Sequence, residues 1–178
     1  MFKLISKTIA AVAIVSVALF GSANAKTLKI ETHFTASSPN GEVAAQFAKN
    51  VEMFSGGSLK IEMFYSSSVT GKSAEVFNSA QTGIIDCDMT GAGYQTGKNA
   101  AFQFAGDVMG GYDNPYQQYD FLKFPGAQEA VDALYNKYGM TLIGWWIPGH
   151  ESLISSKPIP DVASIKDFKF RSPPGMES

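Results

Sequence analysis

Hydrophobic and polar residues alternate in two stretches of the first half of the chain. Between residues 27 and 34 every second side chain is apolar or small, and residues 59–65 repeat this spacing. A two-residue period is typical of β-strands, because successive side chains point to opposite faces of a sheet. The apolar run at residues 84–90 predicts a third strand.

Helical spacing separates these strands. Residues 41–54 carry an apolar side chain at every third or fourth position, namely Val43, Phe47, Val51 and Phe54, and residues 73–82 predict a shorter helix. Alternation of strands and helices predicts an α/β fold with an open, mainly parallel sheet. Ligands of such sheets bind at the carboxyl ends of the strands, which here places three loops around a site: residues 35–40, 66–72 and 91–98.

The second half of the chain has shorter patterns. Helices are predicted at residues 116–123 and 128–137. The remaining expected elements are strands at residues 140–147, 152–156 and 169–171, and a helical turn at residues 164–168. Pro173, Pro174 and Gly175 are typical of a turn that leads into another element. We therefore expect the chain to be truncated at its C-terminus.

The first 25 residues have the layout of a secretory signal peptide. Lys3 and Lys7 precede an apolar run at residues 9–20, and Ala23-Asn24-Ala25 supplies the small residues that a signal peptidase accepts. The run is too short for a membrane anchor, which needs about 20 apolar residues. We expect cleavage after Ala25 and secretion into the periplasm.

Charge and composition exclude several kinds of partner and of active site. Without its first 25 residues the chain has 12 basic and 16 acidic side chains, so nucleic acid is not an expected partner. The single cysteine, Cys87, lies in an apolar run and is expected to be a buried thiol. Neither His33 nor His150 has a second ligand at metal spacing. We expect no metal centre and no enzymatic activity.

Two segments come close to nucleotide-binding motifs without matching them. Residues 66–73 resemble a phosphate-binding loop, but Ser66 stands where that motif requires glycine. Residues 91–97 miss the dinucleotide fingerprint by one position. We interpret both segments as loops. Tyr94, inside the second loop, either points into a cleft or packs beneath the loop.

Two further features are candidates for a binding site. Trp145 and Trp146 are adjacent, so in an extended chain they point to opposite sides, and one of them lines a cleft unless both sides are covered. Arg171 is expected to close a strand. Its planar guanidinium matches the two oxygens of a carboxylate, although a surface arginine without a binding role would fit the position as well.

Three segments taken together resemble the solute-binding subunits of TRAP transporters, the DctP family. They are residues 94–104 (YQTGKNAAFQF), 144–149 (GWWIPG) and 169–177 (KFRSPPGME), and their order and spacing agree with the family over essentially the whole chain after residue 25. Residues 85–88 also resemble the family's recurring start of a strand.

The resemblance implies two α/β lobes that close on an organic anion. Residues 26–143 would form the first lobe and residues 144–178 the incomplete start of the second. By position in the family's motifs, Arg171 would hold the ligand carboxylate and Tyr94 would face the ligand. Trp146 is a further candidate, as the tryptophan of the pair that lines the cleft. In the family's keto-acid-binding branch the loop after the strand of Trp145 supplies a polar contact, and residues 149–152 do not reproduce that pattern. Glu151 is the candidate there, and its acid allows for a cation that bridges to the anion, while no other cofactor is expected.

The expected function follows from the same resemblance. The protein would capture a small organic carboxylate and deliver it to the membrane permease subunits of a TRAP transporter driven by an ion gradient. A secreted sensor subunit that presents the same ligand to a signalling receptor is the alternative. The sequence does not separate the two.

Overall fold

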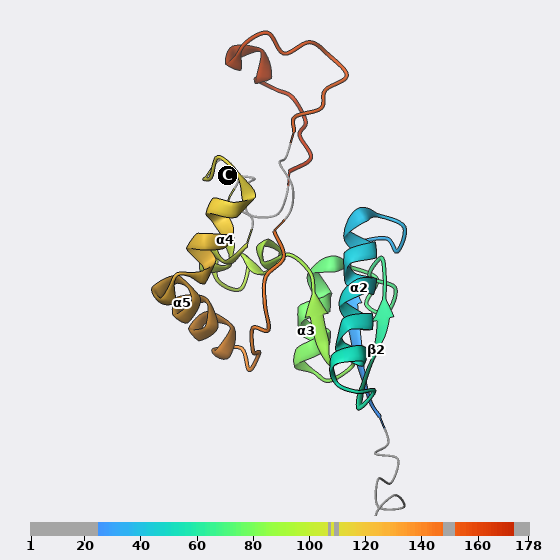
Figure 1. Ribbon diagram of the computed structural model, residues 1–178. Helices are drawn as coiled ribbons and strands as arrows, with labels where there is room; N and C mark the ends of the chain where they lie inside the picture. Colours follow the sequence, from blue (N-terminus) through green and yellow to red (C-terminus); the bar gives the residue numbers. More distant parts are fainter. Residues whose placement is uncertain (1–24, 107, 109–110, 148–151, 173–178) are drawn as a thin grey trace, which may run out of the picture.

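The computed structural model describes residues 25–106, 108, 111–147 and 152–172 (Figure 1). Its centre is a three-stranded parallel sheet in the order β2-β1-β3. The strands are β1 (Lys26–Thr32), β2 (Leu59–Phe64) and β3 (Cys87–Met89). The predicted α/β class with a parallel sheet is therefore present.

The third strand is shorter than the sequence predicts. The backbone N–H groups of Ile84 and Ile85 both donate to the carbonyl of Ser79, at 2.9 and 3.4 Å. These amides close the end of the preceding helix and are not available for a strand ladder. Pairing with β1 therefore begins only at Cys87, opposite Ile30.

Helix α2 (Pro39–Phe54) connects β1 to β2 and packs against β2 (Figure 1). Ser38 caps its first turn, since the Ser38 hydroxyl accepts from the Gly41 N–H at 3.1 Å. The predicted inward face is partly wrong: Val43 and Phe54 are 60% and 80% exposed, whereas Ala44 is fully buried. A Cβ at Gly41 would overlap the Thr35 carbonyl, so the segment that leads into the helix folds closely against its first turn only because residue 41 is glycine.

The connection from β2 to β3 contains a 3₁₀ turn, η1 (Ser73–Glu75), and helix α3 (Val76–Gln81). Helix α3 packs against β3 and buries Val76 and Phe77. Gly83 follows the helix with a φ of 76°, a left-handed conformation that suits glycine at a helix end. The predicted helix at residues 73–82 therefore forms, but as two shorter pieces.

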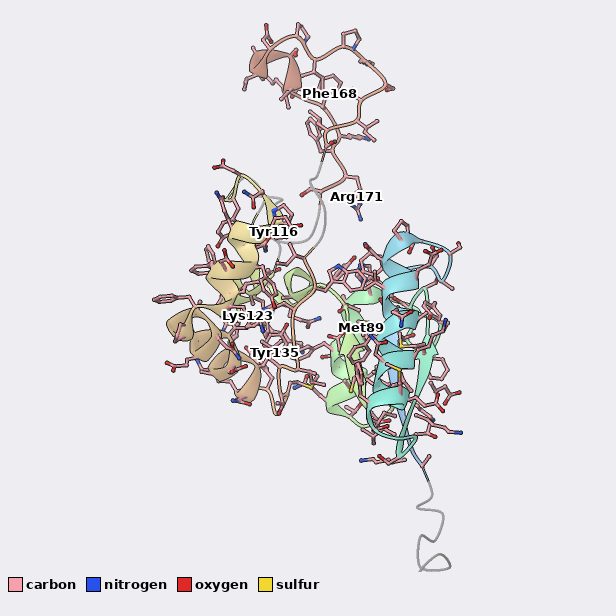
Figure 2. All side chains as sticks on the ribbon, viewed as in Figure 1. Met89, Tyr116, Lys123, Tyr135, Phe168 and Arg171 are labelled. Atoms are coloured by element: carbon pink, nitrogen blue, oxygen red, sulfur yellow. The ribbon has the colours of Figure 1, made fainter. Side chains whose placement is uncertain are left out.

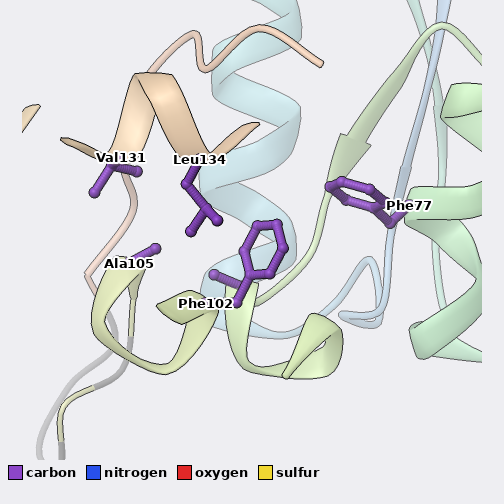
Figure 3. Packing of buried hydrophobic residues seen from close by; sticks show 6 residues of the cluster. Phe77, Phe102, Ala105, Val131 and Leu134 are labelled. Carbon is purple, nitrogen blue, oxygen red and sulfur yellow. The ribbon is translucent and has the colours of Figure 1, made fainter. Parts of the chain in front are cut away.

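A second layer forms from two 3₁₀ turns, η2 (Ala92–Gln95) and η3 (Ala100–Ala105), and two helices, α4 (Pro115–Lys123) and α5 (Pro125–Asn136). Phe124 separates the two helices with extended backbone angles, because the residue before a proline avoids the helical region. Of these elements, η2, η3 and α5 share a hydrophobic core with α3, shown in Figure 3: Phe77, Ala92, Phe102, Ala105, Val131 and Leu134.

The strands expected at residues 140–147, 152–156 and 169–171 do not form. A strand requires a hydrogen-bonded neighbour, and no segment among the described residues pairs with these three. Residues 140–147 instead run beside the core, where Met140, Leu142 and Trp145 pack. Residues 152–172 leave the rest of the chain as a long excursion (Figure 1) with one 3₁₀ turn, η4 (Val162–Ile165), earlier than the helical turn predicted at 164–168. None of the helices in the described part of the chain is long and apolar enough to cross a bilayer.

Candidate ligand-binding site

Four rings gather beyond the carboxyl ends of β1 and β3. The ring of His33 lies 5.4 Å from that of Tyr94 in an edge-to-face arrangement and 3.9 Å from that of Phe34. Phe34 is stacked on Trp146, with ring centroids 4.6 Å apart and planes 8° from parallel. We call His33, Phe34, Tyr94 and Trp146 the aromatic cluster. All four side chains are half-buried, so the cluster is neither core nor open surface.

The parallel sheet explains why these rings meet. His33 and Phe34 directly follow β1, and Tyr94 lies on η2, shortly after β3. The carboxyl ends of neighbouring parallel strands lie at the same edge of a sheet, so residues distant in sequence converge there. Tyr94 and Trp146 were proposed from the sequence and lie in this cluster. His33 and Phe34 were not proposed, although a ring directly after a strand was the available signal.

The two tryptophans separate as expected for an extended chain. Trp145 packs against the hydrophobic core, whereas Trp146 joins the aromatic cluster. The Nζ atom of Lys123 lies 5.7 Å from the centroid of the Trp145 ring, a cation–π contact that also links α4 to this segment. The opposite orientations follow from backbone geometry alone, because no ladder is present here.

Two carboxylates lie near the carboxyl ends of the neighbouring strands β1 and β3. Glu31 and Asp88 are paired in the strand register, and alternation places their side chains on the same face of the sheet. Glu31 is fully buried, and the Asp88 Oδ1 atom is buried although part of that residue is accessible. Glu31 Oε2 and Asp88 Oδ1 have no hydrogen-bond partner among the described residues. Charged residues inside apolar strands were the sequence signal for this pair.

Burial perturbs the titration of several groups around the pair. It raises the pKa of Asp88 from 3.8 to about 6, with the nearby Glu31 charge adding to the effect and hydrogen bonds from Thr90 opposing it. Burial also raises the pKa of Cys87, with smaller contributions from Asp86 and Asp88. The same cause lowers the pKa of His33, which favours a neutral imidazole beside Tyr94. Cys87 is therefore a poor nucleophile at neutral pH.

The remaining sequence-predicted residues do not lie in the cluster. Arg171 is exposed and lies on the excursion formed by residues 152–172 (Figure 2), and its guanidinium has no hydrogen-bond or ion-pair partner in the described part of the chain. The strand that Arg171 was expected to close does not form, since residues 169–171 have no pairing partner there. Glu151 lies outside the described residues.

Within the described ranges, no three His, Cys, Asp or Glu side chains come together as a metal-binding group. Glu31 and Asp88 are neighbours in the strand register but are not part of such a group.

A family model and solved structures both match this chain. The model of the bacterial extracellular solute-binding proteins, family 7 (DctP), matches residues 30–177. A TRAP periplasmic solute-binding protein of Rhodobacter sphaeroides, solved in an apo open state, is 28% identical with a TM-score of 0.62, over 66% of this chain and 37% of that chain.

Two other solved structures are more distant and support the fold alone. A TRAP solute-binding protein of Bordetella bronchiseptica, with copurified calcium and picolinate, is 22% identical with a TM-score of 0.58, over 64% of this chain and 34% of that chain. One of Pseudoalteromonas atlantica, with bound sodium and pyruvate, is 20% identical with a TM-score of 0.59, over 65% and 35%.

The chain spans about a third of the length of these solved relatives. Its α/β sheet corresponds to part of their two-lobed periplasmic-binding fold, which confirms the predicted fold class. The comparisons imply no organic cofactor, and metal ions accompany the ligand in two of the relatives. Because the family model matches most of its residues, the chain belongs to the DctP family of bacterial extracellular solute-binding proteins, whose members serve transporters and are not enzymes.

Proposed function

We propose that this chain acts in the periplasm as the solute-binding component of a TRAP-type transporter and captures a small organic carboxylate. The observation that carries the proposal is the aromatic cluster: half-buried rings from three separate segments meet where parallel sheets bind ligands. Pyruvate and picolinate, the ligands of two solved relatives, are both small carboxylates. Rings of this kind would cover the apolar part of such a ligand.

The cluster supplies apolar walls but no positive charge. Neutral His33 contributes no cation, and the buried carboxylates Glu31 and Asp88 would repel an anion placed close to them. An anionic ligand therefore requires a cation from elsewhere in the protein. Arg171 is the candidate, because its guanidinium can form two parallel hydrogen bonds to a carboxylate.

In the proposed mechanism, ligand binding brings the segment of Arg171 toward the aromatic cluster. Residues 26–143 would form the first lobe and residues 144–178 would belong to the second. Trp146 lies at the start of the second range but stacks on Phe34 of the first lobe, so Tyr94 and Trp146 would lie on one side of the ligand and Arg171 on the other. Only a closed arrangement contacts the anion from both sides, so the ligand would favour closure. Glu151 is proposed to bind a cation that bridges to the carboxylate.

Secretion and delivery complete the proposal. The signal peptide at residues 1–25 would be cleaved after Ala25, and the loaded protein would dock on the membrane permease subunits. Mass spectrometry of the protein recovered from a periplasmic fraction would give the position of its first residue. Recovery with Met1 intact would contradict the cleavage.

Calorimetry tests the capture of a carboxylate. The purified protein would be titrated with pyruvate, picolinate and sn-glycerol 3-phosphate, the last as an anion without a carboxylate. We expect binding of at least one carboxylate, and a loss of about 2–5 kcal/mol in the Arg171→Ala variant, as for one partner of a buried charge pair. Lys169→Ala, which removes a neighbouring exposed cation, is the matched control and should bind normally. Equal affinity of the Arg171→Ala variant and the wild type would refute the role of Arg171.

A further inference from the structure

Glu31 makes contacts that its place in a strand does not explain. Its side chain is fully buried, and its Oε1 atom accepts from the backbone N–H of Val69 at 2.6 Å and from that of Thr70 at 3.3 Å. Burying a carboxylate is costly unless hydrogen bonds compensate for the lost water. Two backbone amides aimed at Oε1 supply part of that compensation, and they come from a loop almost 40 residues away in sequence.

The loop that donates these amides is residues 66–72, which follows β2. Ser66 and Ser67 have φ angles of 57° and 51°, in the left-handed region that non-glycine residues seldom adopt. Such a conformation is strained for a residue with a side chain and persists only where the surroundings hold it. The Glu31 carboxylate is one part of those surroundings.

The same loop holds the end of β1. The N–H of Ser66 donates to the carbonyl of Phe34 at 2.9 Å, and the N–H of Ser67 donates to the carbonyl of Thr32 at 3.1 Å. Phe34 in turn stacks on Trp146. A continuous set of contacts therefore runs from the Glu31 carboxylate through the loop to the aromatic cluster.

The sequence of the loop fits this arrangement. Residues 66–73 resemble a phosphate-binding loop, in which consecutive backbone N–H groups point at an anion. Here the amides of Val69 and Thr70 already have an anion, supplied by the protein itself. The resemblance reflects a shared backbone arrangement and not a nucleotide site.

We infer that Glu31 is a positioning residue: its carboxylate serves as an internal anion for the amides of Val69 and Thr70, and so sets the place of loop 66–72 and of Phe34 in the aromatic cluster. The charge matters as well as the shape. Charge-assisted hydrogen bonds are roughly twice as strong as neutral ones, so an isosteric amide would hold the loop less firmly. The consequence for ligand affinity rests on the proposed function, whereas the holding of the loop does not.

The test measures the loop directly, without a ligand. Backbone amide exchange of residues 66–71 would be followed by NMR in the wild type, Glu31→Gln and Glu31→Ala. Glu62→Ala, which removes an exposed carboxylate from the neighbouring strand β2, is the matched control. We expect exchange about 5-fold faster in Glu31→Gln and more than about 10-fold faster in Glu31→Ala, with no change in the control.

A second readout follows the aromatic cluster. In a Trp145→Phe background, Trp146 is the sole tryptophan, so its fluorescence reports the stack on Phe34. We expect a shifted emission maximum in Glu31→Ala that Glu31→Gln largely restores. If Glu31→Ala does not fold, the isosteric Glu31→Gln variant decides. Unchanged exchange of Val69 and Thr70 in a folded Glu31→Gln variant would overturn the inference.

Titration with sodium pyruvate then separates the two proposals. If the wild type binds pyruvate, Glu31→Ala should bind it at least about 10-fold more weakly, because the rings are no longer held in place. If the wild type binds none of the carboxylates, the proposed function fails while the exchange result for the loop still stands. Normal pyruvate binding by Glu31→Ala with a loosened loop would overturn the link from the loop to the cluster.

Discussion

Replacement of Asp88 by asparagine should stabilise the protein at neutral pH and leave it unchanged in acid. Asp88 lies beside Glu31 in the strand register, and Asn has nearly the same size without the ionisable group. Burial, and to a smaller extent the charge of Glu31, raises the pKa of Asp88 from 3.8 to about 6. The folded protein therefore binds this proton more tightly than the unfolded chain does.

The sign and size of the effect follow from linkage. Between about pH 4 and pH 6 the folded state holds the proton and the unfolded state has released it, so the free energy of unfolding falls as pH rises through this window. Above pH 6 the cost of the buried charge is fully present. A displacement of about 2 pKa units at 1.36 kcal/mol each gives about 3 kcal/mol. Asp88→Asn removes this cost, and with it the fall of the free energy of unfolding between pH 4 and pH 6.

Urea unfolding at pH values from 4 to 8 would measure the difference between Asp88→Asn and the wild type. That difference should grow from pH 4 to 6 and then level off near 3 kcal/mol, while any constant offset reflects the new amide. Asp120→Asn, on the exposed side of α4, is the control and should show no such slope. A difference that stays flat across this range would refute the reasoning that Asp88 is a destabilising buried acid.

Two further predictions concern the layer beside the sheet. Phe102 is fully buried and packs edge-to-face against Phe77, with ring centroids 5.8 Å apart. Phe102→Ala should therefore lower the free energy of unfolding in urea by about 3–5 kcal/mol. Phe104→Ala, at a position that is 67% exposed, should lower it by less than about 0.5 kcal/mol. The Asn114 side chain caps α4, because its Oδ1 atom accepts from two N–H groups of the first turn at 3.0 and 3.1 Å. Asn114→Ala should lower the free energy of unfolding by about 1 kcal/mol, whereas Asn114→Asp should keep the wild-type value. Equal stability of the two variants would contradict the capping role.

The sequence by itself determined which segments are strands and helices in the first half of the chain. Alternation at residues 27–34 and helical spacing at residues 41–54 are local properties, visible without any partner, and they correspond to β1 and α2. The same is true of the opposite orientations of Trp145 and Trp146. Segment order then fixed the α/β class, because strands separated by helices pair in parallel.

Which face of an element is buried was decided only by the tertiary structure. Spacing predicted Val43 and Phe54 inward, yet they are 60% and 80% exposed, whereas Ala44 of the same helix is fully buried. The carboxylate of Glu31 became acceptable in the sheet because a distant loop donates two amides to it. The strand expected at residues 140–147 did not form because a strand depends on a neighbour that periodicity does not reveal. Periodicity describes one segment at a time, whereas pairing, burial and charge compensation each require a second segment.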